Sequence, residues 1–308
     1  MRLKDFVSIA SYSKAELRHI LDVARQLKTQ YKTKGRNDPI LLGKTLAMIF
    51  EKPSLRTRVS FNVAMTQLGG TGLILRDEEV GLGKREPVQD VARVLSGMCD
   101  GIMARTFSHE NVKLLAQYAT VPVINALTDY SHPCQAMADL MTIEEHFGLL
   151  EGHTVVYIGD GNNVARSLSV ACGKFGMRFI AATPPGYALP DDDMKRIMSQ
   201  VPEMNFQTTN DPREAARLAD VLVTDTWVSM GQEQEKAQRI RDFAGFSIDE
   251  SLLAIAPKHA VVLHCLPAYR GYEISETVLE GPQSLVFAEA ENRLHFQKGL
   301  VAVLLGHA

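Results

Sequence analysis

The sequence predicts an α/β protein made of two doubly wound parallel-sheet domains, with the active site in the cleft between them. Short apolar runs alternate with amphipathic helical patterns along almost the whole chain, which is typical of parallel sheets covered by helices on both faces. This alternation occurs in two successive series. The 308 residues also exceed the length at which a single hydrophobic core usually keeps growing.

The first series begins with a helix, for which Ser13 and Glu16 form a capping box. Strands are expected at 46–50, 72–75, 101–104 and 121–124, with helices near 54–68, 87–98, 109–118 and 132–147. The second series has strands at 154–158, 179–181, 221–224 and 261–264. Gly148 to Gly152 mark the break between the series. We expect a first domain over 1–147, completed by a C-terminal helix over 288–308, and a second domain over 148–287.

The composition is that of an ordinary globular protein, with 45% hydrophobic and 22% charged residues and a formal net charge of -3. Basic residues are dispersed, which argues against nucleic acid as a partner. No signal-peptide core or membrane-length apolar run is present. We therefore expect no membrane partner. The cysteines lack paired metal-ligand spacing, so we expect no metal site, and we expect a cytoplasmic location with reduced thiols. They are Cys99, Cys134, Cys172 and Cys265.

Residues 50–58, Phe-Glu-Lys-Pro-Ser-Leu-Arg-Thr-Arg, predict an anion-binding turn. An apolar strand pattern ends at Phe50, and a helical pattern starts beyond Pro53. Free N–H groups and the positive end of the helix dipole favour an anion there. Two arginines in the first turn, Arg56 and Arg58, are unfavourable unless a dianion such as phosphate binds. The alternative is that both are ordinary surface residues.

Other strand ends of the first series carry polar residues as well. Arg105 ends the third strand, and His132 and Gln135 lie on the entry turn of the helix that follows the fourth. A lone histidine is more often a capping or packing residue than a catalytic one. The carboxyl ends of parallel strands meet at one edge, however, and convergence of these groups with the 50–58 turn predicts a shared site.

In the second series, Gly159-Asp160-Gly161-Asn162-Asn163 follows a strand and opens a helix, which suggests a dinucleotide site. Val164 stands where the third small residue belongs, and the next strand ends in Thr183 without an acid for a ribose. A nicotinamide-dependent dehydrogenase is therefore disfavoured. Asn162 and Asn163 are better interpreted as polar groups facing a cleft.

Asp225, at the end of the 221–224 strand, is suited to pair with a substrate ammonium. Ser229-Met230-Gly231 is either a flap or a plain connecting loop. Cys265 is expected to bind rather than to act as a nucleophile, because His264 should point to the opposite face of the strand.

Taken together, these motifs resemble the aspartate/ornithine carbamoyltransferase family over essentially the whole chain. Asp225 to Gly231 is similar to the flap of the ornithine branch, which the aspartate branch lacks. The motifs that carry the resemblance, in chain order, are Ser54–Arg58, Arg105–Phe107, His132–Gln135, His264–Pro267 and Glu291–Arg293.

The resemblance implies transfer of a carbamoyl group from carbamoyl phosphate to the δ-amine of ornithine, without a cofactor. It implies four catalytic residues, Arg105, His132, Cys265 and Arg293. The carbamoyl-phosphate ligands it implies are Ser54, Leu55, Arg56, Thr57, Arg105, His132, Gln135, Cys265, Leu266 and Arg293. The ornithine ligands it implies are Asn163, Asp225, Ser229 and Met230.

One position departs from the family pattern. The family's homotrimer places a glutamine or histidine from a neighbouring subunit just before a Leu-Gly pair, where this chain has Gly81. Either Lys84 or Arg85 replaces that contact, or the contact is weaker. Two alternative functions remain open: a carbamoyltransferase for another amine such as putrescine, and a non-catalytic sensor of phosphate or an amino acid.

Overall fold

The computed structural model describes residues 4–306 and confirms the predicted class of two α/β parallel-sheet domains. Unit 1 comprises Met1–Ala138 and Glu291–Ala308, and unit 2 comprises Asp139–Ala290. These divisions fall inside helices α6 (Pro133–Phe147) and α13 (Val286–Leu305), whereas the expected domain limits lay near the helix ends. Residues 1–3 and 307–308 of the expected first domain lie outside the described residues.

Unit 1 contains a four-stranded parallel sheet in the order β2-β1-β3-β4. Its strands are β1 (Thr45–Phe50), β2 (Thr71–Arg76), β3 (Gly101–Arg105) and β4 (Val123–Leu127). The strand expected at 121–124 therefore had the wrong limits. Pro122 has no N–H and contributes only its carbonyl, which accepts the Ile102 N–H at 2.8 Å, so pairing with β3 begins at Val123.

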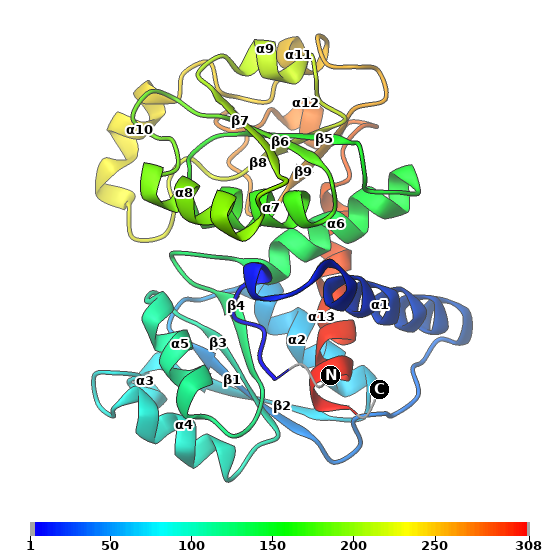
Figure 1. Cartoon of the computed structure of the whole chain (residues 1–308), viewed down its shortest axis with the longest axis vertical. Coiled ribbons are helices and arrows are strands. Elements are labelled where there is room, and N and C mark those ends of the chain that lie inside the picture. Colours follow the sequence, from blue (N-terminus) through cyan, green and yellow to red (C-terminus); the bar gives the residue numbers. More distant parts are fainter. Residues whose placement is uncertain (1–3, 307–308) are drawn as a thin grey trace. The chain divides into compact units, whose positions relative to one another are not determined.

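Helices cover both faces of this sheet (Figure 1). The helices α4 (Val88–Ser96) and α5 (His109–Tyr118) pack on one face, where Ile49, Ile102 and Val91 share a fully apolar core. The helices α2 (Leu55–Gln67) and α13 lie on the other. The first helix, α1 (Lys14–Lys34), starts at the predicted capping box, and α3 (Asp77–Val80) follows β2.

Unit 2 contains a five-stranded parallel sheet in the order β7-β6-β5-β8-β9. Its strands are β5 (Thr154–Ile158), β6 (Arg178–Ala182), β7 (Asn205–Thr209), β8 (Val221–Thr224) and β9 (Val261–His264). The helices α9 (Pro212–Ala216), α11 (Glu250–Leu253) and α12 (Glu276–Leu279) contribute to the core on one face. The helices α7 (Asn163–Lys174) and α8 (Asp191–Gln200) lie on the other, and α10 (Lys236–Asp242) follows the 225–235 loop (Figure 1).

Each sheet reverses its strand order at one place, and this determines where polar loops gather. In unit 1 the reversal lies between β1 and β3, and in unit 2 it lies between β5 and β8. At such a point the two connections leave in opposite directions, so the carboxyl ends of the strands flank a crevice that commonly binds a ligand. The motifs after β1, β3, β5 and β8 are among those that the sequence singled out.

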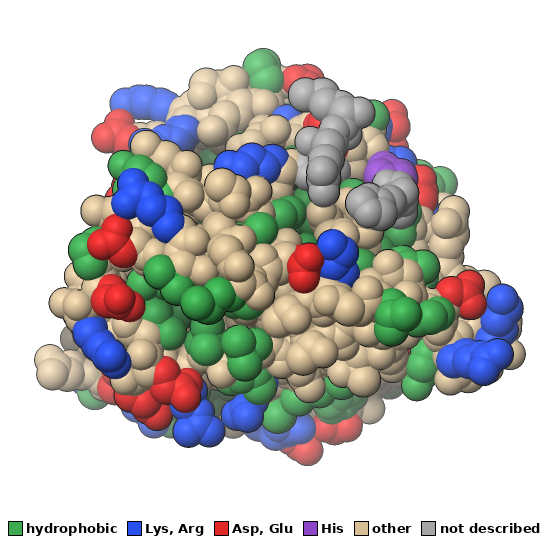
Figure 2. Space-filling model, turned by 90° about the horizontal axis from the view of Figure 1, so that it is seen from below, with side chains coloured by type: hydrophobic (Ala, Val, Ile, Leu, Met, Phe, Trp, Pro, Cys, Tyr) green, Lys and Arg blue, Asp and Glu red, His purple; other side chains and the backbone are tan. Residues whose placement is uncertain are grey.

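The surface carries charges of both signs. On the face drawn in Figure 2, acidic and basic side chains are interspersed, with groups of hydrophobic side chains between them. Among residues 4–306, no helix combines the length and apolar character needed to cross a membrane.

Candidate active site

The turn between β1 and α2 has the predicted strand-to-helix geometry. Ser54 is the N-cap of α2, and its Oγ accepts the Thr57 N–H at 3.2 Å. The remaining N–H groups of the first turn and the helix dipole create a positive potential at this end. Arg56 lies in that first turn, with no acidic side chain in it. The turn therefore has the local charge that binding of a dianion requires.

Thr57 is the centre of a buried polar cluster in unit 1. Its Oγ1 accepts hydrogen bonds from Arg105 Nη1 at 3.4 Å and from Arg293 Nη2 at 3.1 Å. Arg293 Nη1 also donates to Gln135 Oε1 at 2.6 Å. These residues come from α2, the end of β3, α6 and α13, and all four are buried. The structure thus brings four of the sequence-predicted residues into one hydrogen-bonded group.

His132 belongs to the same electropositive environment. Its ring is buried, and burial is the main reason that the pKa of His132 lies well below its usual range. The positive charges of Arg293, Arg105 and Arg56 lower this pKa further. The imidazole is consequently neutral at physiological pH, a state in which one ring nitrogen carries a proton that it can donate.

A cavity of about 440 Å³ lies next to the α2 N-terminus. Ser54, Leu55 and Arg58 line it, together with residues of β2 and α3, but Thr57 and Arg105 do not. Leu55 is 73% exposed, so its side chain faces away from the buried cluster. Only the backbone of Leu55 is therefore suited to the anion-binding turn.

In unit 2 the corresponding site is built around Asp225, which follows β8. One carboxylate oxygen accepts Asn162 Nδ2 at 2.9 Å, and the other accepts the Thr226 N–H at 2.8 Å and the Cys265 thiol at 3.0 Å. Asp225 is buried. Three donors hold the carboxylate in a fixed orientation, as a group that pairs with a cation must be held.

Cys265 is a protonated hydrogen-bond donor. Burial is the main cause that raises the pKa of its thiol well above the usual value, and the negative charge of Asp225 raises it further. A thiol in this state is a poor nucleophile, and the binding role of Cys265 stays a prediction. The next residue, Leu266, has φ 55°, a left-handed conformation that is strained for a leucine and that tends to occur at functional sites.

His264 was expected to point to the opposite face of the strand, but one of its ring nitrogens lies within 4.8 Å of the Cys265 sulfur. Its Nδ1 accepts the Leu266 N–H at 2.8 Å, so Nε2 carries the proton and donates to Glu273 at 3.0 Å. Among residues 4–306, Asp225, His264 and Cys265 are the one group whose ligand atoms are close enough for a cation. Both ring nitrogens of His264 are already used, so the group is better explained as a hydrogen-bonded cluster than as a metal site.

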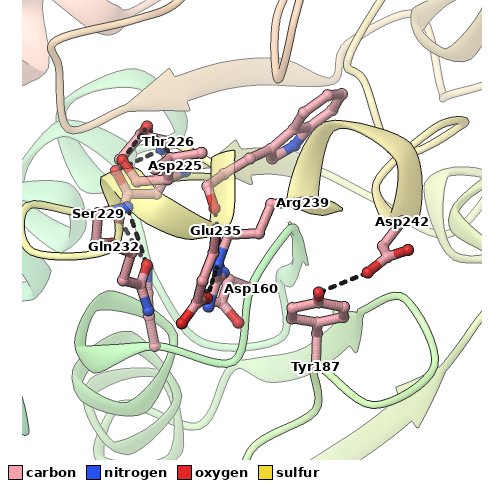
Figure 3. A network of polar contacts seen from close by, with 12 residues as sticks. Asp160, Tyr187, Asp225, Thr226, Ser229, Gln232, Glu235, Arg239 and Asp242 are labelled. Carbon is pink, nitrogen blue, oxygen red and sulfur yellow. Dashed lines mark hydrogen bonds and ion pairs between the residues drawn. The ribbon is translucent and has the colours of Figure 1, made fainter. Parts of the chain in front are cut away.

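The 225–243 segment is anchored by Arg239, as Figure 3 shows. Arg239 donates to Asp160 at 2.9 Å, to Glu235 at 2.8 Å and to the Trp227 carbonyl at 3.1 Å. Its guanidinium also lies 5.1 Å from the centre of the Tyr187 ring. Arg239 is buried, and it connects the turn after β5 with both ends of the loop that contains the flap motif.

The flap motif itself forms a turn with local hydrogen bonds. The Ser229 N–H donates to Gln232 Oε1 at 3.0 Å, and the Gly231 N–H donates to the Glu233 carboxylate at 3.0 Å. Met230 is 45% exposed, and Ser229 is half-buried. The backbone of this turn is therefore ordered by its own side chains.

Two features of the Gly159–Asn163 turn add to the sequence interpretation. Asn162, expected to face a cleft, is the N-cap of α7 and accepts the Val164 and Ala165 N–H groups at 2.9 and 3.1 Å. Gly161 packs against the 187–189 backbone, where a Cβ would lie 2.4 Å from the Leu189 nitrogen. Close packing against this backbone thus explains why residue 161 is a glycine. Asn163 is the first residue of α7.

Comparison with known proteins agrees with this arrangement. A family model described as the carbamoyl-P binding domain of aspartate/ornithine carbamoyltransferase matches residues 4–145, and the Asp/Orn binding domain of the same family matches residues 151–304. The chain belongs to the aspartate/ornithine carbamoyltransferase family.

Relatives within that family include several ornithine carbamoyltransferases. The chain is 51% identical to the ornithine carbamoyltransferase of Carboxydothermus hydrogenoformans, with 99% of this chain and 98% of that protein covered. It is similar to the structure of ornithine carbamoyltransferase from Pyrococcus furiosus, with a TM-score of 0.95, 45% identity and coverage of 100% and 98%. The enzyme from Thermus thermophilus gives a TM-score of 0.88 and 44% identity, with 99% and 100% covered.

Proposed function

We propose that the protein transfers the carbamoyl group of carbamoyl phosphate to the δ-amine of L-ornithine, giving L-citrulline and phosphate. The observation that carries the proposal is the buried cluster of Thr57, Arg105, Gln135 and Arg293 beside the α2 N-terminus. The N–H groups of the α2 N-terminus and the guanidinium groups of Arg105 and Arg293 meet there. None of the four cluster residues is acidic. A small acyl phosphate matches both the charge and the polar donors of this cluster.

The phosphate binds at the first turn of α2. Ser54, the Leu55 backbone, Arg56 and Thr57 surround it, and Arg105 adds a second guanidinium. The carbamoyl carbonyl oxygen accepts a hydrogen bond from the Thr57 hydroxyl. Two guanidinium groups occupy the acceptor positions of Thr57 Oγ1, so its proton is directed outward as a donor.

His132 and Arg293 assist at the same carbonyl oxygen, and Gln135 binds the carbamoyl amide. A neutral His132 donates a hydrogen bond without adding a full charge before the reaction. Negative charge develops on the carbonyl oxygen as the tetrahedral intermediate forms, and donors aimed at it are worth roughly 3–4 kcal/mol each. Backbone carbonyls of Cys265 and Leu266 complete the amide's ligands.

Ornithine binds to unit 2. Asp225 pairs with the α-ammonium, while Asn163, Ser229 and Met230 hold the remaining α-amino-acid groups. The Cys265–Asp225 pair orients the δ-amine. The nitrogen lone pair of the neutral δ-amine attacks the carbamoyl carbon, and the carbon–oxygen bond to phosphate breaks. The departing phosphate accepts the proton that the amine loses, so no dedicated general base is required.

The assembly we propose is a homotrimer in the cytoplasm. Several large apolar side chains of unit 1 are exposed, among them Leu42 at 77%, Val59 at 50% and Met98 at 76%. An apolar surface of this kind is suited to contact with another subunit. The 81–86 loop of a neighbour is proposed to reach the cavity beside Ser54, with Lys84 or Arg85 in place of the contact missing at Gly81.

The decisive experiment is a citrulline-formation assay with carbamoyl phosphate and a panel of amines that includes ornithine and putrescine. Arg56→Ala should lower kcat/KM by a factor on the order of a thousand. Arg36→Ala, at an exposed arginine of the same unit, is the control and should retain activity. Folding of both variants is checked by thermal unfolding. Equal activity of wild type and Arg56→Ala would refute the proposed phosphate site, and a preference for putrescine would refute the proposed acceptor.

A further inference from the structure

Tyr157 is a fully buried residue of β5, and the proposed reaction gives it no role. Its hydroxyl lies close to the turn that follows the strand, because a Cβ on Gly159 would be 3.6 Å from the hydroxyl oxygen. The same Cβ would be 3.7 Å from Thr224 Oγ1, at the end of β8. Tyr157 therefore lies where the sheet of unit 2 reverses its strand order, close to the residues proposed to hold ornithine.

The Tyr157 hydroxyl is a hydrogen-bond donor that stays protonated. It donates to Asn162 Oδ1 at 3.3 Å. Burial is the main cause that raises the pKa of Tyr157 well above its usual value, and the negative charges of Asp225 and Asp160 raise it further. The hydroxyl consequently keeps its proton at neutral and moderately alkaline pH.

The Asn162 amide is held from two different elements. Its oxygen accepts the N–H groups of Val164 and Ala165 from helix α7 and the hydroxyl of Tyr157 from strand β5. Its nitrogen donates to Asp225 Oδ2 at 2.9 Å. Because a side-chain amide accepts at one end and donates at the other, donors at its oxygen direct its N–H groups toward Asp225.

This chain of hydrogen bonds ends at the carboxylate that is proposed to bind the substrate. Asp225 Oδ1 accepts the Cys265 thiol and the Thr226 N–H, and Oδ2 accepts Asn162. A carboxylate has about four acceptor positions, so these three donors from residues 4–306 leave a position on Oδ2 for an ammonium. The direction of that position depends on how Asn162 is held.

We propose that Tyr157 is a positioning residue for ornithine binding, whose hydroxyl holds Asn162 so that Asp225 presents its remaining acceptor position to the α-ammonium. The inference rests on the function proposed above, in which Asp225 pairs with this ammonium. Since Tyr157 is fully buried, it acts through Asn162 and not on the substrate itself. The loss of one such neutral hydrogen bond changes affinity on the order of fivefold.

Two substitutions separate the donor from the ring that carries it. Tyr157→Phe removes only the hydroxyl, and Asn162 Oδ1 keeps its two donors from α7, so no buried acceptor is left unpaired. Replacement of Tyr157 by 4-aminophenylalanine restores an N–H donor at the same place. If Tyr157→Phe does not fold, 4-fluorophenylalanine takes its place, because the fluorine fills the space of the hydroxyl and cannot donate.

The kinetic test measures KM for each substrate, kcat and the midpoint of thermal unfolding. Tyr157→Phe should raise KM for ornithine on the order of fivefold, leave KM for carbamoyl phosphate unchanged and unfold near the wild-type midpoint. The 4-aminophenylalanine variant should recover most of the affinity. Tyr12→Phe is the matched control, because it removes the hydroxyl of a buried tyrosine that packs against Phe6 in unit 1.

The infrared S–H stretching band of Cys265 gives a second measurement, made without substrate. Its frequency reports the hydrogen bond to Asp225, since such a bond lowers the stretching frequency of the donor. Cys265→Ala identifies the band among those of the four cysteines. Tyr157→Phe should shift the band to higher frequency, because a looser Asn162 leaves Asp225 less well oriented toward the thiol.

The outcomes separate this proposal from the proposed function. An unmoved band in Tyr157→Phe would overturn the positioning role whatever the activity, and so would an unchanged KM for ornithine or equal rises of KM for both substrates. Failure of 4-aminophenylalanine to restore the affinity would exclude a role for the donor. A wild type that forms no citrulline, with a band that shifts in Tyr157→Phe, would contradict the proposed function and support the positioning of Asp225 by Tyr157.

Discussion

At the scale of single residues, the protonation states in the site favour attack by a neutral amine. Cys265 remains a thiol and His132 a neutral imidazole, because burial disfavours their charged forms. Neither group changes charge between neutral and moderately alkaline pH. The ionisable group that governs the rate in that range is then the substrate amine.

We therefore predict that the rate rises with pH above neutrality. A lysine-like amine has a pKa of about 10.4, so the reactive neutral fraction increases by up to about tenfold per pH unit below that value. The measurement is kcat/KM for ornithine at saturating carbamoyl phosphate, from about pH 6.5 to about pH 9.5. A rate constant independent of pH over this range would contradict attack by the neutral amine.

The residues of the site were predictable where they lie in contiguous motifs. Ser54, Arg56, Thr57 and Arg105 follow strands that hydrophobic patterning reveals, so their convergence followed from the rule for parallel sheets. The pairing between Asn162 and Asp225 was not predictable, because its members are far apart in the sequence. Such contacts depend on strand order and register, which local periodicity does not determine.

At the scale of elements, hydrophobic patterning predicted every strand except β7. This edge strand reads Asn-Phe-Gln-Thr-Thr and is largely exposed, so it has neither an apolar run nor a clear alternation. The helices α3, α8, α9, α10, α11 and α12 were likewise not assigned from the sequence. Four of them, α3, α9, α11 and α12, have only four or five residues, which are too few to show helical periodicity. The buried strands and long helices, by contrast, carry a strong signal.

The 225–243 segment provides a prediction at this scale. Arg239→Met should raise KM for ornithine on the order of tenfold, because Asp160 and the Trp227 carbonyl lose the guanidinium that holds the flap loop. KM for carbamoyl phosphate should not change. Arg241→Met, at an exposed position on the same helix, is the control. Equal effects of the two substitutions would show that Arg239 does not position the flap loop.

Helix α13 provides a prediction about stability. Burial lowers the pKa of Lys298 to about 8 from a usual 10.5. The unfolded chain therefore binds more protons than the folded one between about pH 8 and about pH 10.5, and the Lys298 contribution to the free energy of unfolding rises with pH across that window. The expected gain is at most about 3 kcal/mol.

Chemical unfolding of wild type and Lys298→Met at several pH values tests this sign. Lys298→Met should show a flatter dependence on pH in that window, and Lys34→Met, at an exposed position in α1, should behave as wild type. Identical pH profiles of wild type and Lys298→Met would contradict the buried, low-pKa state of this lysine.

At the scale of the whole molecule, the exposed surface bears on the subunit assembly that we propose. Exposed apolar residues such as Met98 are suited to contact with another subunit. Gly81 departs from the family pattern, in which a glutamine or histidine at this place reaches the site of a neighbouring subunit. A glycine has no side chain to make that contact, so we expect Lys84 or Arg85 to make it.

We predict a solution mass of three times the 34.0 kDa chain. Light scattering coupled to size exclusion measures this mass, and the citrulline assay on the same fractions links it to activity. Lys84→Ala and Arg85→Ala, made singly, should identify which side chain reaches the neighbouring site, because only that variant loses activity while remaining trimeric. A fully active monomer would exclude a shared site.

At Asn162, the hydrogen bonds of the site restrict the choice of residue more than the N-cap position alone does. Serine, threonine and aspartate begin helices as well as asparagine does, so the start of α7 by itself tolerates any of them. Asn162 must also donate an N–H to Asp225 while its oxygen accepts from the helix, and none of those substitutes has a side-chain amide. Sequence variation at position 162 should therefore be restricted to asparagine in variants that retain activity, even though the fold alone permits more.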